Sequence, residues 1–244
     1  MIPEYAELHC LSNFSFLRGA SNPEELVERA HRLGYAGIAI TDECSLAGVV
    51  RAYTQLKRLR TAAEEQGLEI TLPRLLIGAE FLVRDDLTGE PDFKLVAIAR
   101  HLEGYGNLCQ FITQLRRESA TKGRYRLRRA QLQPGRLDGC QLILLPRRAA
   151  DDAALLAPAL WLLRHYPGQA WIGIELLREI GDELWLQRLR ELSETTALPL
   201  VACGDVHMHL RSRKPLQDVM TATRLGKRVR DCGMDLQPNA ERHL

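Results

Sequence analysis

The sequence predicts an α/β protein whose strands and helices alternate and close, or nearly close, into a parallel barrel. Three observations support this class. Short apolar runs alternate with helical patterns along the 244 residues, the order is mostly strand then helix, and polar residues gather at strand ends. An open doubly wound sheet is the alternative. The length and the 45% hydrophobic content suit one large α/β domain or two small ones.

The expected elements follow from the spacing of the apolar residues. The predicted strands are short apolar runs and cover residues 5–10, 37–41, 74–83, 93–99, 140–146, 170–176 and 198–204. The predicted helices have apolar residues at helical spacing and cover residues 22–34, 46–66, 104–117, 150–165, 179–196 and 214–225. Residues 84–92, RDDLTGEPD, suggest a hairpin between the third and fourth strands. No pattern resolves residues 116–139.

The first helix has explicit signals at both ends. Asn22 is a good N-cap, Pro23 suits the first helical position, and Glu25 completes the spacing of a capping box. Gly34 can end the helix in a left-handed conformation. The following run GIAIT, residues 37–41, is apolar throughout, as expected for a parallel strand covered on both faces.

The last predicted helix starts at Pro215 and ends at Gly226. Its apolar spacing predicts an inward face made of Leu216, Val219, Met220 and Thr223.

Composition limits the classes of function. The net charge of +2 does not indicate a nucleic-acid-binding protein, and only the run at 116–129, RRESATKGRYRLRR, is strongly basic. That run is either a DNA-contacting patch or a solvated, mobile connection. The cysteines form no C-x-x-C pair, which suggests reduced thiols. There is no signal-peptide core and no apolar run of the roughly 20 residues needed to span a bilayer. We therefore expect a cytoplasmic protein without membrane contact.

Polar residues stand at the ends of several predicted strands, where side chains from distant positions converge in a parallel barrel. They are His9, Asp42, Glu43, Glu80, Asp205 and His207. Each alone has a structural explanation, such as helix capping for an aspartate or a hydrogen bond for a histidine. Together they are suitable ligands for Zn²⁺ or Mn²⁺.

These stretches, in this order, resemble the PHP (polymerase and histidinol phosphatase) domain. The resemblance is carried by LHCLSNFSFLRGAS, AITDECSLAGVVRAY, GAEF, GYGNLCQFI and CGDVHMHLRSRKPLQDVMTATRLGK, and it covers essentially the whole chain. More narrowly, the chain is similar to the N-terminal PHP domain of bacterial C-family DNA polymerase α subunits, in particular the error-prone, damage-tolerance branch.

The resemblance implies a distorted (β/α)₇ barrel, TIM-barrel-like and a single domain, over residues 1–210. Residues 211–244 would form a C-terminal helix and a segment leading towards a polymerase core that this chain lacks. Active members of the family hold a metal cluster and hydrolyse phosphoesters, and some act as 3′–5′ exonucleases.

Carried over residue by residue, the resemblance implies a degenerate metal site. The residues that would remain of it are His9, Glu43, Glu80, Asp205 and His207, with Glu43 standing where the family has a histidine. The positions where ligands are lost are Leu11, Arg18 and Lys94, and no ligand stands near 146–148. Cationic side chains would repel metal ions and neutralise the remaining carboxylates. We therefore predict ion pairs at Arg18, Lys94 or both, with no catalytic residues, no metal and no other cofactor.

The function implied is that of a silent structural and interaction domain. The full-length protein would be a DNA-directed DNA polymerase that uses Mg²⁺, DNA and dNTPs in translesion synthesis. Its partners would be the remainder of the polymerase chain and other damage-tolerance (mutasome) proteins. No D-x-D polymerase motif occurs in these 244 residues.

Two other functions stay open. One is a residual phosphoesterase or proofreading nuclease with a single Zn or Mn on His9, Glu80, Asp205 and His207. A variant of it uses His207 and His209, although His209 is expected to face solvent. The other is a DNA-binding module that uses residues 116–129, with strongly salt-dependent affinity.

Overall fold

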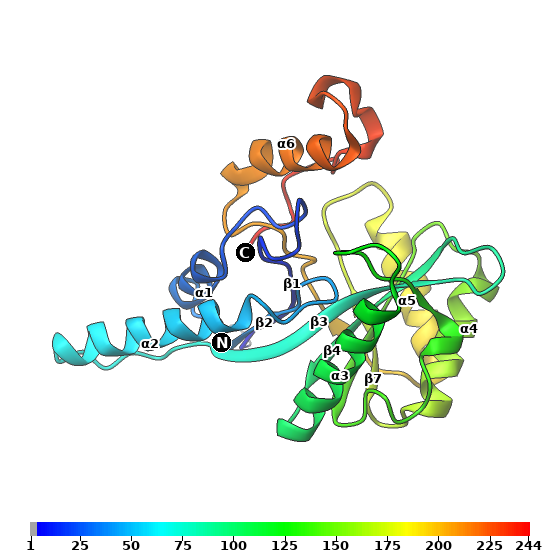
Figure 1. Cartoon of the computed structure of the whole chain (residues 1–244), viewed down its shortest axis with the longest axis horizontal. Coiled ribbons are helices and arrows are strands. Elements are labelled where there is room, and N and C mark those ends of the chain that lie inside the picture. The colour runs from blue at the N-terminus through cyan, green and yellow to red at the C-terminus, as the bar shows by residue number, and fades with distance from the viewer. Residues whose placement is uncertain (1–3) are drawn as a thin grey trace. The chain divides into compact units, whose positions relative to one another are not determined.

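The computed structural model describes residues 4–244 and divides them into two compact units. The first unit comprises the chain up to Ile77 together with Leu177–Glu179 and Gly204–Leu244, and the second comprises Gly78–Leu176 and Ile180–Cys203. Strands and helices alternate through both units, so the predicted α/β class is confirmed. Figure 1 traces the elements along the chain.

Among the described residues, the first unit contains two complete strands, the start of a third and three α-helices. They are β1 (Ala6–Cys10), α1 (Pro23–Arg32), β2 (Gly37–Ile40), α2 (Val49–Glu65), the first residues of β3 (Arg74–Arg84) and α6 (Lys214–Leu225). β2 pairs in parallel with both β1 and β3. The helix signals are confirmed: the Asn22 backbone N–H donates to Glu25 Oε2 at 2.8 Å, and Gly34 has a φ of +70°.

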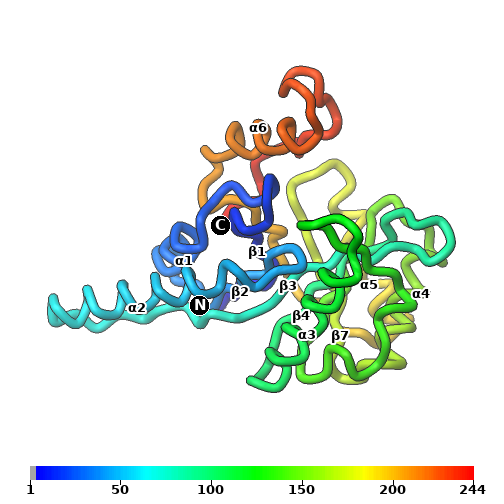
Figure 2. The backbone as a smooth tube through the Cα atoms, in the orientation of Figure 1, coloured from blue at the N-terminus to red at the C-terminus, as the bar shows by residue number. Residues whose placement is uncertain are grey.

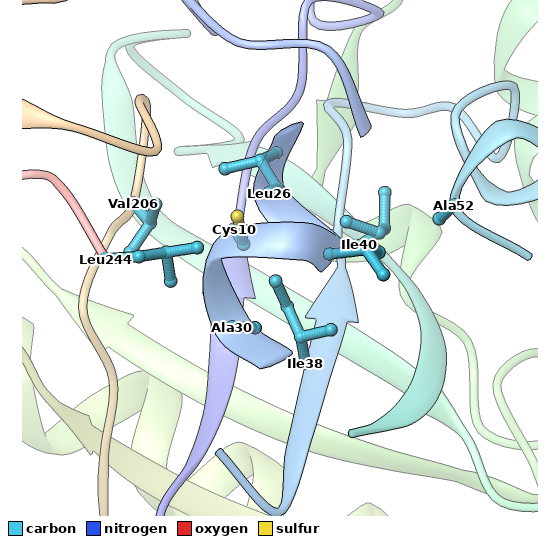
Figure 3. Close-up of a cluster of buried hydrophobic side chains, with 9 residues drawn as sticks. Cys10, Leu26, Ala30, Ile38, Ile40, Ala52, Val206 and Leu244 are labelled. Atoms are coloured by element: carbon cyan, nitrogen blue, oxygen red, sulfur yellow. The ribbon is translucent and has the colours of Figure 1, made fainter. Parts of the chain in front are cut away.

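The core of the first unit forms where α1 packs over β1 and β2. Leu26 and Ala30 of α1 meet Ile38 and Ile40 of β2 in one buried cluster (Figure 3). The same cluster includes Cys10, Val206 and Leu244, so residues from the start and the end of the chain share one core. Figure 2 shows the C-terminus returning to the neighbourhood of β1. Burial of this apolar surface is what holds the C-terminal segment in place.

The second unit carries the rest of β3 and most of the sheet. Its other elements are β4 (Pro91–Ala99), α3 (Leu102–Glu118), β5 (Leu127–Arg128), β6 (Cys140–Pro146), α4 (Asp152–His165), β7 (Ala170–Ile174), α5 (Asp182–Thr196) and β8 (Leu200–Ala202). Hydrogen-bonded neighbours follow the order β1-β2-β3-β4-β6-β7-β8, and β5 pairs with β3.

The expectation of a parallel sheet is corrected at β4, which runs antiparallel to both β3 and β6. The cause is the predicted hairpin at residues 84–92. Asp85 accepts hydrogen bonds from the backbone of Leu87 and Thr88, and Gly89 has a φ of +72°. A turn this short can join only antiparallel strands.

The prediction for the last helix is correct in its extent and wrong in its orientation. α6 spans Lys214–Leu225, but the residues it buries are Gln217, Thr221 and Ala222. Leu216 and Val219 are 41% and 51% exposed. The helix turns Gln217 inward because that side chain hydrogen-bonds a buried histidine, His207, at 2.8 Å.

Candidate functional site

Three of the predicted site residues come together in the first unit. His9 lies at the end of β1, and Asp205 and His207 flank Val206, which bridges Cys10 in parallel. His9 precedes Cys10, and Asp205 and His207 stand on either side of Val206, so the bridge brings the three residues together. His9 Nδ1 lies 3.6 Å from Asp205 Oδ1, and His207 Nε2 lies 3.2 Å from the same oxygen. All three side chains are buried.

His207 is oriented from its other nitrogen by α6. The Gln217 amide lies 2.8 Å from His207 Nδ1, and Gln217 is itself buried. A ring that accepts from Gln217 at Nδ1 carries its proton on Nε2 and donates it to Asp205. In that tautomer, the nitrogen facing Asp205 has no lone pair for a metal ion.

Arg242 completes this cluster, and sequence reasoning missed it. Its Nε donates to Asp205 Oδ2 at 2.8 Å, and its Nη1 lies 3.8 Å from Glu179 Oε1. The Arg242 side chain is only 12% exposed. No spacing in the sequence links a C-terminal arginine to a carboxylate 37 residues earlier. The contact arises from the return of the chain end to β1.

Glu43 forms a second ion pair in the first unit. Arg18 Nη1 lies 2.7 Å from Glu43 Oε2, with both side chains partly buried. The sequence predicted an ion pair for Arg18, and the structure contains it. Arg18 thus binds a carboxylate at a position where the family resemblance implies a metal ligand.

The loop that carries Arg18 is held by Asp42. Asp42 accepts hydrogen bonds from the Ser12 backbone N–H at 2.8 Å and from the Ser12 and Ser15 hydroxyls at 2.7 Å. Burial raises the pKa of Asp42, and these hydrogen bonds oppose the rise. Gly19 passes so close to Ser12 that a Cβ would stand 2.0 Å from its carbonyl oxygen. Asp42 therefore has a structural role, as its strand-end position also allowed.

Glu7 is a further buried carboxylate of the first unit, and sequence reasoning did not single it out. It accepts hydrogen bonds from the backbone N–H groups of His9 and Gly204, at 2.8 and 3.0 Å, and from the Tyr5 hydroxyl at 2.9 Å. Burial raises the pKa of Glu7, and these donors partly offset the effect. With both oxygens engaged, Glu7 ties β1 to the Asp205 segment. Its position two residues before His9 in the same strand is the signal that could have found it.

In the second unit, Glu80 is paired with Lys94. Lys94 Nζ on β4 lies 3.1 Å from Glu80 Oε2 on β3, and the Glu80 side chain is fully buried. The two strands are neighbours in register, with Leu82 opposite Lys94. The sequence predicted an ion pair for Lys94, and the structure contains it.

Leu11, where the resemblance implies a second histidine, is fully buried and part of the apolar interior. Its backbone N–H donates to Val206 O at 2.8 Å. The position has therefore become a packing position in the first unit.

The residues of the first unit do not fit the metal cluster that the resemblance implies. Leu11 offers no donor atom, Arg18 is a cation, and Asp205 Oδ2 is bound to Arg242. A divalent ion about 4 Å from the Arg242 guanidinium would be repelled by roughly 8 kcal/mol at an effective dielectric of 20. The three cations Arg18, Lys94 and Arg242 thus each bind an acidic residue of the predicted site.

His209 was expected to face solvent, but the structure shows it largely buried. Its side chain is 13% exposed, and its Nδ1 lies 2.7 Å from the Ser21 hydroxyl. Burial lowers the pKa of His209. His207 and His209 therefore have separate partners, which does not favour their joint use as metal ligands.

The basic run 116–129 is anchored at several points. The Tyr125 hydroxyl accepts from the Leu82 backbone N–H at 2.8 Å, and Leu127 is buried in β5. Arg116 lies over the Tyr125 ring, and Arg129 pairs with Asp92. DNA contact by the remaining exposed cations stays a prediction.

Alternating strands and helices, with polar side chains gathered at strand ends, define an α/β domain. The chain belongs to the PHP domain family, whose model matches residues 7–153. A solved structure assigned to the metal-dependent phosphoesterases, from Bifidobacterium adolescentis, has a TM-score of 0.55 at 16% identity and covers 84% of this chain and 88% of its own. The predicted PHP-barrel class is thereby confirmed.

Among curated proteins, this chain is similar to error-prone DNA polymerases. That of Methylococcus capsulatus is 51% identical over 240 residues, which are 98% of this chain and 21% of the relative. That of Azoarcus sp. is 48% identical over 259 residues, 99% of this chain and 23% of the relative. The chain thus spans about a fifth of the length of these relatives. Among the residues that the structure describes, no helix combines the length and apolar character needed to cross a bilayer.

Proposed function

We propose that this chain is the PHP domain of an error-prone DNA polymerase and acts there as a catalytically silent structural and interaction domain. The proposal is supported above all by three ion pairs, in which Arg242, Arg18 and Lys94 each bind an acidic residue of the predicted site. Polymerisation across DNA lesions, with DNA, dNTPs and Mg²⁺, belongs in this proposal to the remaining four fifths of the polymerase. Its partners are that remainder and other damage-tolerance proteins.

The test combines metal analysis with activity assays on the purified chain. We expect protein prepared without chelators to contain far less than one Zn or Mn ion per chain. We also expect no primer extension and no 3′–5′ exonuclease activity, because Leu11 and the paired cations remove the ligands such chemistry needs. Measurable primer extension by this chain would refute the proposal.

A residual single-metal phosphoesterase or proofreading exonuclease is the second candidate. It is favoured by the two buried histidines, His9 and His207, that face one oxygen of Asp205. A near-stoichiometric content of Zn or Mn, together with metal-dependent hydrolysis of a phosphoester, would support this candidate over the first.

An exposed apolar surface supports the interaction role. Leu216 and Val219 of α6 are exposed, and Val229 and Met234 beyond it are 39% and 99% exposed. Exposed apolar residues close together on one helix are typical of a surface that another part of a protein covers. The matched polymerases are four to five times as long as this chain, which leaves ample protein to cover it.

Replacement of Leu216 and Val219 by glutamate tests this surface. In the isolated chain, the melting temperature should change by no more than about 2 °C, because both side chains are exposed. In the full-length polymerase, the same pair should lower the melting temperature by several degrees, because the charges would be buried against the covering part. Leu87→Glu, on the exposed hairpin turn, is the matched control. Equal effects of the two changes in the long protein would argue against the surface.

A further inference from the structure

We propose that the outer face of α2 binds the phosphate backbone of double-stranded DNA. The inference rests on the proposed function, since it assumes that the chain belongs to a DNA polymerase. It goes further by naming a surface of the first unit and the partner that this surface fits. We call this surface the α2 basic face, and it consists of Tyr53, Lys57, Arg58, Arg60 and Thr61.

One side of α2 packs on the first unit, and the other side is exposed. Ala52 and Ala63 are buried, and Leu56 and Leu59 pack against the core cluster of the unit. The five residues of the α2 basic face lie between these positions in the helix, and all five are exposed. In Figure 1, the second half of α2 extends past α1 and the strands of the same unit. The α2 basic face is therefore accessible to a partner.

The chain itself does not neutralise the cations of the α2 basic face. Lys57, Arg58 and Arg60 form no ion pair with a carboxylate of residues 4–244. Arg51, in the first turn of the same helix, is paired with Glu24, with 2.6 Å between Arg51 Nε and Glu24 Oε1. Lys57 and Arg60 are three positions apart, so they are neighbours on the helix surface and repel each other. An anionic partner would remove this repulsion.

The order of charges along α2 is the reverse of the order that stabilises a helix. Because of the helix dipole, carboxylates are favourable in the first turn and cations in the last turn. The first turn of α2 contains no acidic residue, and its last turn contains no basic residue but ends with Glu64 and Glu65. Helix stability therefore does not explain the cations of the α2 basic face, whereas binding of an anion does.

The side chains of the α2 basic face suit phosphate groups better than a protein surface. Phosphate oxygens in protein–DNA complexes are bound by arginine, lysine and hydroxyl-bearing side chains. Tyr53 and Thr61 bring hydroxyl groups to positions one turn before and one turn after Lys57. Three of the five side chains are cationic, whereas charged residues are depleted at the centre of protein–protein interfaces.

The shape of the α2 basic face favours a duplex over a single strand. The face is the convex surface of a helix, and the major groove of B-DNA is wide enough to admit an α-helix. Proteins that hold single strands use a groove that follows the backbone, together with aromatic side chains that stack on the bases. Tyr53 is the one aromatic residue of the face, and Lys57 Nζ lies over its ring, 5.0 Å from the ring centre. Double-stranded DNA is therefore the expected partner.

The experiment measures binding of this chain to a fluorescein-labelled duplex by fluorescence anisotropy, in the presence of EDTA. If three phosphates are contacted, the affinity should fall by roughly 40-fold between about 50 and about 200 mM KCl. The test variant combines Lys57→Gln, Arg58→Gln and Arg60→Gln. Its plot of log affinity against log salt should be shallower by about 2.7, and its affinity at low salt should be at least about tenfold lower.

The matched control removes three exposed arginines from other helices. It combines Arg164→Gln on α4, Arg190→Gln on α5 and Arg224→Gln on α6. The control changes the net charge of the chain by the same amount and should keep the native affinity and salt dependence. Both triple variants leave the basic run 116–129 intact, and each should change the melting temperature by no more than about 2 °C, because the replaced side chains are exposed.

Four results would each overturn the inference. They are no binding of the duplex at low salt, native binding by the α2 variant, equal losses in both triple variants, and tighter binding of the matching single strand or of polyglutamate than of the duplex. If the α2 variant does not fold, Lys57→Gln with Arg58→Gln takes its place, with an expected change in slope of about 1.8. The metal and primer-extension assays of the proposed function do not involve α2, so failure of one hypothesis is distinguishable from failure of the other.

Discussion

Lys94→Met should lower the free energy of unfolding by about 2–3 kcal/mol. The change leaves the Glu80 carboxylate, which is fully buried, without the ammonium group 3.1 Å away. We place the expected cost slightly below the usual range for a broken buried ion pair, because the Lys94 side chain is 29% exposed and water can reach part of the site. Urea or thermal unfolding followed by circular dichroism measures the effect.

The control is Lys227→Met, which breaks the exposed pair with Asp235 and should cost no more than about 1 kcal/mol. The double change Glu80→Gln with Lys94→Met should recover much of the loss, because neither charge then remains buried. EDTA should leave the melting temperature of the native chain unmoved. A drop of several degrees in EDTA would show that metal ions, rather than Lys94, neutralise these carboxylates.

Leu11→Ala should cost about 3 kcal/mol of unfolding free energy, since deletion of a buried leucine side chain leaves a cavity. The Leu11 side chain is fully buried, so water cannot readily fill the cavity that its removal would leave. Leu11→His tests whether a histidine at this position is enough to restore metal binding. It restores the histidine that the family resemblance implies, but it should destabilise the fold and should not create metal binding, because Arg18 and Arg242 keep their carboxylates.

Leu33→Ala is the matched control for Leu11→Ala. The Leu33 side chain is 40% exposed, so its removal should cost no more than about 1 kcal/mol. The interpretation of Leu11 as a packing residue would be wrong if Leu11→His folded with native stability and bound Zn²⁺ or Mn²⁺ in dialysis.

The local features of the fold could be predicted from the sequence because they depend on neighbouring residues. The N-cap at Asn22, the left-handed Gly34 and the hairpin around Asp85 all follow from residues within a few positions of one another. The ion pairs of Arg18 and Lys94 could be predicted only with the family resemblance. That resemblance states which distant positions share a site, which one sequence does not.

The orientation of α6 shows what the spacing of apolar residues cannot predict. The spacing of Leu216, Val219 and Met220 correctly places them on one face of a helix. It does not say which face meets the protein, and Gln217 faces inward because His207 needs a partner there. The apolar face was left exposed as a result.

The sequence by itself determined most of the elements and their order, because apolar spacing and turn residues are local properties. The loss of ligands such as Leu11 could be inferred only with the family resemblance. Only the tertiary structure decided that β4 also pairs antiparallel with β6 and that Arg242 lies on Asp205. Contacts between distant segments depend on how the chain returns upon itself. Here, burial of Leu244 against β1 brings the arginine to the carboxylate.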